Sequence, residues 1–365
     1  MLMIQFQIDT LSFWEYRADS GEADIICTYK RKASNDLTQA FTSFSKIFSE
    51  CSYNSTEDIL VTIPLGPANY PSLSYLDEKY IRDVEEYIHN QPMYFRELLV
   101  FLEHIHQLEP NKRIAILSDN GFFQPLIMKN PAFAVPPEIQ KGHKMVFRGI
   151  HGARHQRVRD KLGDKANFIS IVLDKVTSLV AVKGGELLLS STGYSLFEGI
   201  MGLTNCGDID PGIILYLLKE KGYSMFEIDD MLKKKSGFKG FLSEAISAPE
   251  SLKYLALTDS KLQLAFDIFR NQLLKYIGQS FLNLGRVDSI VVSGDFLPAF
   301  YSFTIDLLEH ISFAGISLRE NKCRPPDSKI FWEVLTRDNS KITVLFNHES
   351  LSCIWGKVAA HRGLC

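Results

Sequence analysis

Short runs of apolar, β-branched residues recur along the chain and are bounded by turn-forming or charged positions. Such runs are typical of buried strands, and they predict strands at residues 3–8, 24–29, 59–63, 113–118, 166–173, 289–292 and 342–346. Between them, apolar positions recur every three or four residues, which is the period of an amphipathic helix. This second pattern predicts helices at residues 37–48, 81–88, 94–107, 212–220, 261–278 and 301–311.

A glycine-rich polar stretch at residues 196–212 interrupts this alternation. It follows a predicted β-hairpin, in which two apolar runs flank the pair Gly184-Gly185. It ends where Asp210 precedes Pro211, an N-cap followed by a proline in the first helical turn. Because the stretch is too polar for a buried helix, we expect a loop with a specific conformation.

Composition adds limits to this picture. The chain has 365 residues, enough for two domains of ordinary size, and its formal net charge of −3 gives no reason to expect a nucleic-acid or membrane partner. Its six cysteines contain no CxxC pair, which argues against a disulfide framework or a zinc knuckle and favours a reducing, cytoplasmic environment. No uninterrupted apolar run approaches the roughly 18 residues of a membrane span, and the first residues lack the apolar region of a signal peptide.

Several motifs occur in a fixed order from about residue 119 onwards. They are Gly149-Ile150-His151-Gly152-Ala153-Arg154-His155, Glu198-Gly199-Ile200-Met201-Gly202, Cys206-Gly207-Asp208-Ile209-Asp210-Pro211-Gly212 and Lys275-Tyr276-Ile277-Gly278. In this order they resemble the acetate kinase family. The resemblance implies an α/β, two-domain actin-like ATPase (ribonuclease H-like) fold with mixed sheets and a central cleft. The domains would comprise residues 1–148, completed by a returning C-terminal tail at 350–365, and residues 149–349.

The same resemblance assigns roles to individual residues. Asp119 matches an active-site aspartate, His151 would lie beside the transferred phosphoryl group, and Asn205 occupies the position of a catalytic arginine. Mg²⁺ would be held by Asp9 and Glu349. The nucleotide, ATP or ADP, would contact Ser12, Thr177, Ser178, Gly207, Asp208 and Gly294. The expected reaction transfers the γ-phosphoryl group of ATP to a small carboxylate such as acetate.

The positions that would bind phosphate depart from the family pattern more than those that build the scaffold. Asn205 replaces an arginine, and residues 64–69 and 247–251 lack the arginines that the family carries there. Non-glycine residues at 175–176 and 296–297 interrupt two loops whose glycines permit φ > 0 and a close approach of the backbone to phosphate. Loss of an arginine that stabilises the transition state can lower phosphoryl-transfer rates by about 10³–10⁵.

Some of these assignments have a purely structural alternative. An ordinary β-hairpin explains residues 9–12, where only two residues match the phosphate-binding turn of the family. Capping of the following turn explains an aspartate at the end of a strand, as at Asp119. His151 and His155 lie four residues apart, as zinc ligands can, but no third ligand has metal spacing. The arginines around them are explained by a solvated helix face.

Compensation for the missing arginine is a further possibility. An arginine at position 205 should be sterically possible, because the flanks of that loop keep the family pattern. Arg96, Arg148 and Arg154 are the candidates for a relocated arginine.

Two functions therefore compete. The first is an acetate kinase-like phosphotransferase with a degenerate active site, and the second is a catalytically weak or silent relative that acts as a binding or regulatory module. The resemblance also implies a homodimer with its contact near residues 261–278, and closed two-fold dimers are the commonest soluble assembly.

Overall fold

The structure is a computed structural model of the chain. It describes residues 2–6, 10–17, 19–20, 22–30, 37–50, 58–67, 70–88, 94–124, 133–142, 147–195, 197–242, 259–318, 332–337 and 339–361. The chain divides into two compact units. The first comprises residues 1–157 and 351–365, and the second comprises residues 158–350.

The sheet of the first unit has six strands in the order β3-β2-β1-β4-β6-β5. Their bounds are β1 Leu2–Phe6, β2 Thr10–Arg17, β3 Glu22–Lys30, β4 Ile59–Ile63, β5 Leu73–Tyr75 and β6 Ile114–Ser118. β1, β4 and β6 run parallel, while β2, β3 and β5 are antiparallel to their neighbours. The carboxyl ends of the three parallel strands therefore meet at one edge, where open α/β sheets place their ligands.

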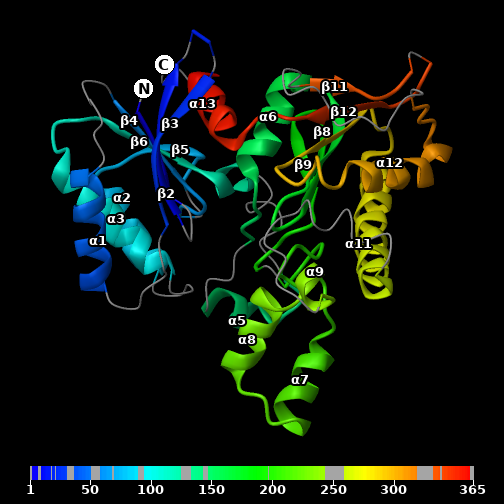
Figure 1. The fold of residues 1–365 in the computed structure, drawn as a ribbon, viewed down its shortest axis with the longest axis horizontal. Helices are drawn as coiled ribbons and strands as arrows, with labels where there is room; N and C mark the ends of the chain where they lie inside the picture. Colours follow the sequence, from blue (N-terminus) through cyan, green and yellow to red (C-terminus); the bar gives the residue numbers. More distant parts are fainter. Residues whose placement is uncertain are drawn as a thin grey trace. The chain divides into compact units, whose positions relative to one another are not determined.

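Alternation along β1 sends its side chains into two different cores. Ile4 and Phe6 pack with residues of α1, α2 and α3, while Met3 points the other way and packs with Trp355 of α13. Figure 1 shows these helices on the two sides of the sheet. The helices of this unit are α1 Leu37–Glu50, α2 Glu78–Ile88, α3 Tyr94–Leu108, η1 Asp119–Phe123, α5 Pro137–Gly142 and α13 Leu351–His361. α6, Gly152–Leu162, contains the boundary between the units.

The second unit has a six-stranded sheet in the order β11-β12-β10-β7-β8-β9. Its strands are β7 Asn167–Val172, β8 Ser178–Lys183, β9 Glu186–Ser190, β10 Ser289–Ser293, β11 Trp332–Val334 and β12 Thr343–Asn347. β10 is central and runs parallel to both β7 and β12. One face of the sheet packs against α11 (Ser260–Leu284) and α12 (Tyr301–His310), which form the largest apolar core, and the short η2 (Ser312–Ala314) follows α12.

The predicted strands and helices are confirmed as elements, with shifts of a few residues at their ends. The largest shift is in α11, which continues past its predicted end at residue 278 to Leu284. Asp259 caps its first turn through the N–H groups of Lys261 and Leu262, and Gly285, with φ of 70°, ends it.

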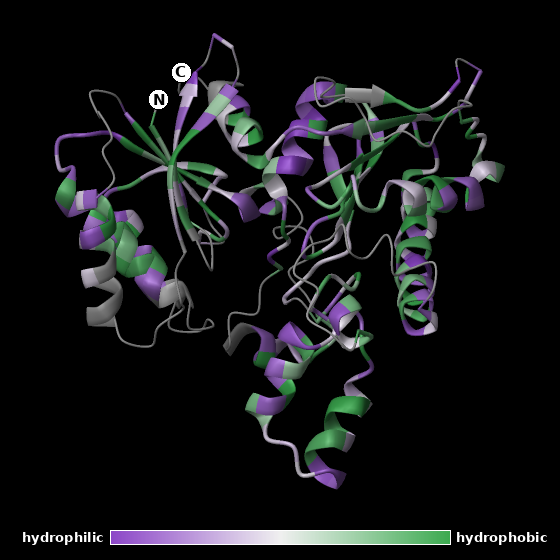
Figure 2. Cartoon of the chain, in the orientation of Figure 1, coloured by the Kyte–Doolittle hydropathy of each residue, from purple (hydrophilic) through white to green (hydrophobic). Residues whose placement is uncertain are grey.

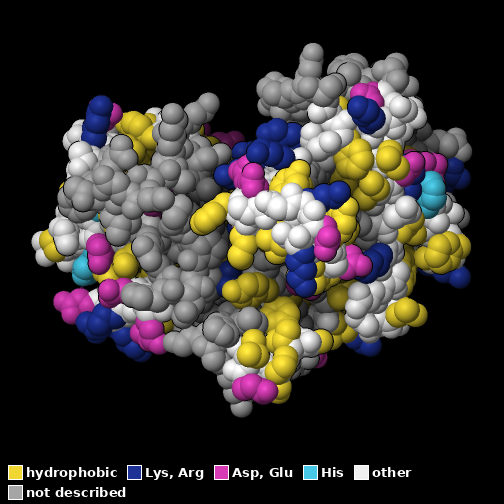
Figure 3. Space-filling model, turned by 90° about the horizontal axis from the view of Figure 1, so that it is seen from below, with side chains coloured by type: hydrophobic (Ala, Val, Ile, Leu, Met, Phe, Trp, Pro, Cys, Tyr) yellow, Lys and Arg dark blue, Asp and Glu magenta, His cyan; other side chains and the backbone are white. Residues whose placement is uncertain are grey.

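Three short helices follow the glycine-rich loop in the second unit. They are α7 Pro211–Glu220, α8 Met225–Lys234 and α9 Gly237–Gly240. α8 begins with a capping box, in which Ser224 and Glu227 satisfy each other's backbone N–H groups. α7 is apolar on several sides (Figure 2), yet none of its residues is buried, and apolar side chains gather on this end of the molecule in Figure 3.

Two expectations drawn from composition concern the cysteines and membrane-spanning segments. Cys27 takes part in a disulfide bond, whereas Cys206 and Cys353 are free thiols. The cysteine spacing argued against a disulfide framework, and the bond at Cys27 runs against that expectation, because spacing along the chain does not report which thiols meet in space. Within the described ranges, no helix is long and apolar enough to cross a membrane.

Candidate functional site

Asp119 stands at the carboxyl end of β6 and binds the start of α6. Its Oδ1 accepts a hydrogen bond from the N–H of Ala153 at 2.9 Å, and the N–H groups of His151 and Gly152 also donate to its carboxylate. Burial raises the pKa of Asp119, while the charge of His151 and the three N–H groups oppose that rise. The carboxylate therefore caps α6 in addition to any chemical role.

The chain reaches α6 through a tight elbow of glycines. A Cβ on Gly152 would lie 1.8 Å from the carbonyl oxygen of Asp119, and a Cβ on Gly149 would overlap the ring of Phe123. Between these glycines, His151 has φ of 61° and is the only described non-glycine residue with positive φ. Backbone strain of this kind collects at functional sites. The elbow brings His151 close enough to Asp119 for its charge to act on that carboxylate.

His155, one turn into α6, is fully buried against the rings of Phe122 and Phe123. Burial, together with the charges of His151 and Arg154, lowers its pKa well below the usual value, so the ring is neutral at pH 7. Within the described part of the chain, no three His, Cys, Asp or Glu side chains form a group that could hold a metal ion.

The strain at His151 leads to a prediction about stability. At an ordinary helical position, glycine is less stable than alanine by about 0.5–1 kcal/mol. At residue 151 we expect the opposite order, with His151→Gly more stable than His151→Ala by about 1 kcal/mol, because a Cβ is disfavoured at positive φ. Urea unfolding of the two variants measures this difference, and both lack the same ring.

The control for this comparison is Arg157, which lies within α6. There, Arg157→Ala should be more stable than Arg157→Gly by the usual amount. An Ala variant at 151 that is as stable as the Gly variant, or more so, would show that the elbow is not strained.

The loop after β4 is where the family pattern predicts an arginine and histidines. In this chain the loop is tied to η1 by the side-chain amide of Asn120, which accepts from the N–H of Gly66 at 2.8 Å and donates to its carbonyl at 3.0 Å. Among the candidates for a relocated arginine, Arg148 and Arg154 are buried, and the side chain of Arg96 lies outside the described residues.

The first strand pair carries two of the predicted ligands. β1 and β2 form an antiparallel hairpin, and Ser12 lies inside β2, opposite Gln5. Its hydroxyl accepts a hydrogen bond from Thr28 of β3 at 3.0 Å. Asp9, the predicted magnesium ligand of this turn, lies outside the described residues.

In the second unit, Asp208 ties the glycine-rich loop to α11. Its carboxylate accepts from the N–H of Gly199 at 2.6 Å, from Lys275 Nζ at 2.5 Å and from the hydroxyl of Tyr276 at 3.1 Å. Burial, with the charge and hydrogen bond of Asp208, raises the pKa of Tyr276. Asp210 caps α7 through the N–H of Gly212 at 2.7 Å. Both aspartates of the motif are therefore engaged in building the loop and its helix.

Asn205 lies inside this loop and is 2% exposed. Its Oδ1 lies 2.3 Å from the position that a Cβ on Gly202 would take, and its carbonyl accepts from the N–H of Gly202 at 3.1 Å. Gly207 has φ of 66° and is equally enclosed by backbone. The accommodation of an arginine at position 205 stays a prediction, and the side chain it would replace is enclosed by the loop.

The loop between β7 and β8 is the predicted phosphate loop. The N–H of Lys175 donates to Asp174 Oδ1 at 2.8 Å, and the carbonyl of Lys175 accepts from the N–H of Leu203 at 2.8 Å. The carboxylate of Asp174 thus occupies the backbone N–H group of Lys175. Backbone N–H groups in such loops are the groups that bind phosphate oxygens. Thr177 and Ser178 are buried, and Thr177 faces the cavity described next.

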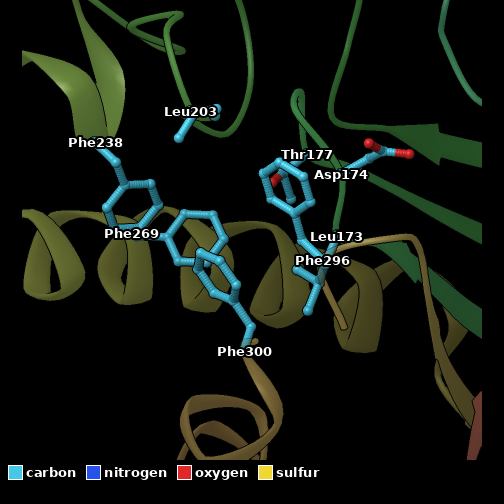
Figure 4. A pocket seen from close by; sticks show the side chains of 9 residues that line it. Leu173, Asp174, Thr177, Leu203, Phe238, Phe269, Phe296 and Phe300 are labelled. Carbon is cyan, nitrogen blue, oxygen red and sulfur yellow. The ribbon is translucent and has the colours of Figure 1, made fainter. Parts of the chain in front are cut away.

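A group of aromatic rings fills the space beside this loop (Figure 4). Phe296, which follows β10, stacks on Phe300 with ring centroids 6.2 Å apart. Phe300 in turn contacts Phe238 of α9 and Phe269 of α11, and the centroids of these three rings lie 5.3–5.7 Å apart. The cavity among these rings, Asp174 and Thr177 measures about 10 Å³. That is at the lower limit for one water molecule.

Sequence reasoning found Phe296 but missed the other three rings. A weak signal existed, since Phe266 and Phe269 share one predicted helix, while Phe303 lies inside another and Phe300 directly precedes it. Only the packing of these helices brings the rings together.

Gly294 and Glu349 lie at the carboxyl ends of β10 and β12. Gly294 has φ of 112°, and a Cβ there would lie 2.0 Å from the carbonyl oxygen of Leu173. Glu349 is 2% exposed, and its N–H donates to Asn347 Oδ1 at 2.9 Å. A buried carboxylate of this kind is an oxygen donor that suits Mg²⁺.

Together, the two mixed sheets and their helices define an α/β protein of the actin-like ATPase type. The solved structures agree with this class: the chain superposes on Porphyromonas gingivalis acetate kinase with a TM-score of 0.83 at 20% identity, covering 99% of this chain and 98% of that one. The acetate kinase of Entamoeba histolytica gives 0.80 at 21% identity, with 98% of each chain covered. At these identities the likeness establishes the fold.

The sequence comparisons give the family. The model of the Acetokinase family matches residues 12–351, so the chain belongs to this family. The acetate kinase of Finegoldia magna is 28% identical over 274 residues, or 74% of this chain and 69% of the relative. That of Syntrophobacter fumaroxidans is 31% identical over 226 residues, or 60% of this chain and 55% of the relative. Acetate kinase-like phosphotransfer with ATP or ADP and Mg²⁺ is thus the chemistry of the family.

Proposed function

We propose that this chain is an acetate kinase-like phosphotransferase with a degenerate active site. The ancestral reaction converts ATP and a short-chain carboxylate, such as acetate, to ADP and an acyl phosphate. In this chain we expect that reaction to be slow, because the nucleotide is held poorly. The observation that carries the proposal is the small volume of the aromatic cavity beside the loop between β7 and β8.

The size of the cavity supports this proposal directly. Sites for small molecules typically have volumes of roughly 300–1,000 Å³, and the cavity among Phe238, Phe269, Phe296 and Phe300 has about 10 Å³. Phe296 stands where the family pattern has a glycine, so its ring occupies space that the family leaves empty. The residues present do not fit a nucleoside at this place.

The charged and polar groups near the cavity also disfavour binding of a polyphosphate. Asp174 lines the cavity and accepts from the N–H of Lys175, so a polyphosphate would meet a carboxylate as well as an amide already in use. With Asn205 buried in the loop, no guanidinium is available at that position to neutralise charge in the transition state. We expect these features to weaken both the binding of the nucleotide and the transfer of its phosphoryl group.

The residues around Asp119 supply what remains of the proposed chemistry. His151 lies in the strained elbow. Its ring would donate a hydrogen bond to a transferred phosphoryl group, or stabilise the negative charge of that group when the ring is protonated. Asp119 would orient that site through the start of α6. Glu349 would supply a carboxylate oxygen to Mg²⁺, which neutralises phosphate charge when bound.

The first test measures nucleotide affinity by isothermal titration with Mg-ATP and Mg-ADP. We expect a Kd weaker than about 1 mM for the natural chain, since the cavity does not admit the base. Phe296→Gly, which removes the obstructing ring, should strengthen binding at least about tenfold. Phe303→Ala is the matched control, because Phe303 belongs to the aromatic group without lining the cavity.

A low-micromolar Kd in the natural chain would contradict the proposal. A Phe296→Gly variant that keeps its far-ultraviolet circular dichroism but gains no affinity would show that another feature blocks the nucleotide.

The second candidate function is a silent relative that acts as a binding or regulatory module. A hydroxamate assay with acetate and Mg-ATP separates the two. Turnover on the order of 1–10 s⁻¹ would establish a fully active kinase, and both proposals would then be wrong. Turnover at least 10³-fold lower, yet abolished in His151→Ala, supports the degenerate enzyme, whereas no turnover favours the silent relative.

Three further expectations belong to this proposal. The domains are taken as residues 1–148 with 350–365, and 149–349, and the chain is taken to act in the cytoplasm. We also propose a two-fold homodimer, for which light scattering should give twice the chain mass of 41.4 kDa.

A further inference from the structure

Two polar side chains lie side by side at the carboxyl ends of β10 and β12. Ser293 is the last residue of β10, Asn347 is the last residue of β12, and the register of these parallel strands pairs the two residues. Paired residues of adjacent strands point to the same face of a sheet. The preceding residues, Val292 and Phe346, belong to the core formed with α11 and α12, so Ser293 and Asn347 face the opposite side.

Both side chains are enclosed, and each carries a polar atom without a protein partner. Ser293 is 0% exposed and Asn347 is 1% exposed. Within the described part of the chain, neither Ser293 Oγ nor Asn347 Nδ2 has a hydrogen-bond partner. Buried polar groups of this kind are rare in native proteins, and they typically bind an ordered water molecule or a ligand. Adjacent strands lie about 4.8 Å apart, so one oxygen atom between the two side chains can reach both.

The other end of the Asn347 amide is already engaged. Its Oδ1 accepts a hydrogen bond from the N–H of Glu349 at 2.9 Å. Because that N–H needs an acceptor, the contact identifies Nδ2 as the unpaired end of the amide. Nδ2 only donates, whereas the hydroxyl of Ser293 both donates and accepts. A water molecule satisfies both groups, since it accepts from Nδ2 and can exchange a hydrogen bond with the hydroxyl.

Backbone contacts hold the hydroxyl of Ser293 in place. The carbonyl of Ser293 accepts from the N–H of Leu173 at 2.7 Å, which ties this residue to the end of β7. Gly294 follows with φ of 112°, and a Cβ there would lie 2.0 Å from the carbonyl oxygen of Leu173. A polar group on a rigid element is suited to hold a neighbouring group in one orientation.

We propose that one internal water molecule bridges Ser293 and Asn347, and that these two residues are positioning residues for Glu349. The inference rests on the proposed function, in which Glu349 supplies an oxygen to Mg²⁺. The water fixes the rotation of the Asn347 amide, and the amide in turn fixes the backbone of Glu349. Mg²⁺ demands near-ideal octahedral geometry and binds through only one or two carboxylates, so the orientation of each carboxylate matters.

A high-resolution crystal structure of the full chain tests the water directly. We expect one ordered oxygen within hydrogen-bond distance of both Ser293 Oγ and Asn347 Nδ2. A direct hydrogen bond between these two side chains, or the lack of any oxygen beside them, would overturn the inference.

Hydrogen exchange followed by NMR tests the effect on Glu349. Ser293→Ala removes one contact of the water and leaves Glu349 itself unchanged. We expect the N–H of Glu349 to exchange about tenfold faster in this variant, because the amide that accepts from it is held less firmly. Ser289→Ala is the matched control, since Ser289 is a buried serine on the same strand and the same face, at the opposite end. It should leave this exchange rate unchanged.

Binding of Mn²⁺ without nucleotide, measured by electron paramagnetic resonance, tests the effect on the metal. Mn²⁺ takes the same kinds of oxygen ligand as Mg²⁺. Asn347→Ala should weaken Mn²⁺ binding about 10–100-fold, as the loss of a residue that orients a metal ligand typically does. Ser293→Ala should weaken it by about tenfold, near the lower end of that range, and Ser289→Ala should have no effect. Glu349→Gln should abolish the binding.

The outcomes separate this inference from the proposed function. If Glu349→Gln abolishes Mn²⁺ binding while Ser293→Ala and Asn347→Ala behave like Ser289→Ala, the positioning role is wrong and the metal ligand stands. If the natural chain binds no Mn²⁺, or Glu349→Gln binds it equally well, the metal ligand is wrong and the positioning role fails with it. Neither result depends on the affinity for nucleotide or on turnover.

Discussion

Replacing Asp208 with alanine should destabilise the second unit by roughly 3 kcal/mol. The change leaves the N–H of Gly199 and the hydroxyl of Tyr276 without their acceptor, and an unsatisfied buried group costs about 1–3 kcal/mol. Lys275 adds little, because it is largely exposed and its ion pair is screened by water. Differential scanning calorimetry should show the transition of this unit lowered by roughly 6–12 °C.

Asp210→Ala, two residues away, is the matched control. It removes one capping hydrogen bond to Gly212 at an exposed helix end, and we expect a loss of only about 1 kcal/mol. Equal effects at 208 and 210 would mean that Asp208 does not organise the loop. Tyr276→Phe should fall between the two, since it removes a single hydroxyl from the network.

Gly294→Ala should destabilise the same unit by about 4 kcal/mol or more. Two costs combine: a non-glycine residue at φ of 112° is strained by roughly 1–3 kcal/mol, and overpacking adds roughly 1–3 kcal/mol. The obstacle is the backbone carbonyl of Leu173 at 2.0 Å, which cannot rotate away as a side chain can. Calorimetry, or a loss of soluble protein on expression, measures the effect.

Gly278→Ala provides the contrast within the same unit. This glycine lies in α11 with open space around it, so a methyl group meets nothing within 4 Å. Alanine should stabilise the helix by about 0.5–1 kcal/mol. If Gly294→Ala were as well tolerated as Gly278→Ala, the close approach of the chain at Leu173 would be refuted.

These two predictions give a physical reason why some motif residues of this chain match the family pattern and others depart from it. Asp208, Asp210 and Gly294 match the family pattern and make contacts on which the fold depends. Lys175 and Phe296 depart from it at places where the fold accepts other residues. Folding therefore constrains the first group even if phosphoryl transfer no longer does, which is consistent with a degenerate site.

The sequence by itself determined the secondary structure and the family. Apolar runs and helical periodicity located the strands and helices, because burial imposes these periods locally. The cap at Asp210 and Pro211 was readable for the same reason, since its hydrogen bond spans only two residues. The ordered motifs around His151 and Asp208 identified the family, which the family match confirmed.

Only the tertiary structure decided how those residues are used. Three examples depend on contacts between parts of the fold that no local pattern connects: Asp208 binds α11, Asn205 is buried beside Gly202, and Asp119 caps α6. The same holds for the rings of Phe238, Phe269, Phe296 and Phe300, which come from α9, α11 and the connection between β10 and α12 and line one cavity. Periodicity reports which side of an element is buried, whereas the identity of its neighbours is fixed by packing, and no local pattern carries that information.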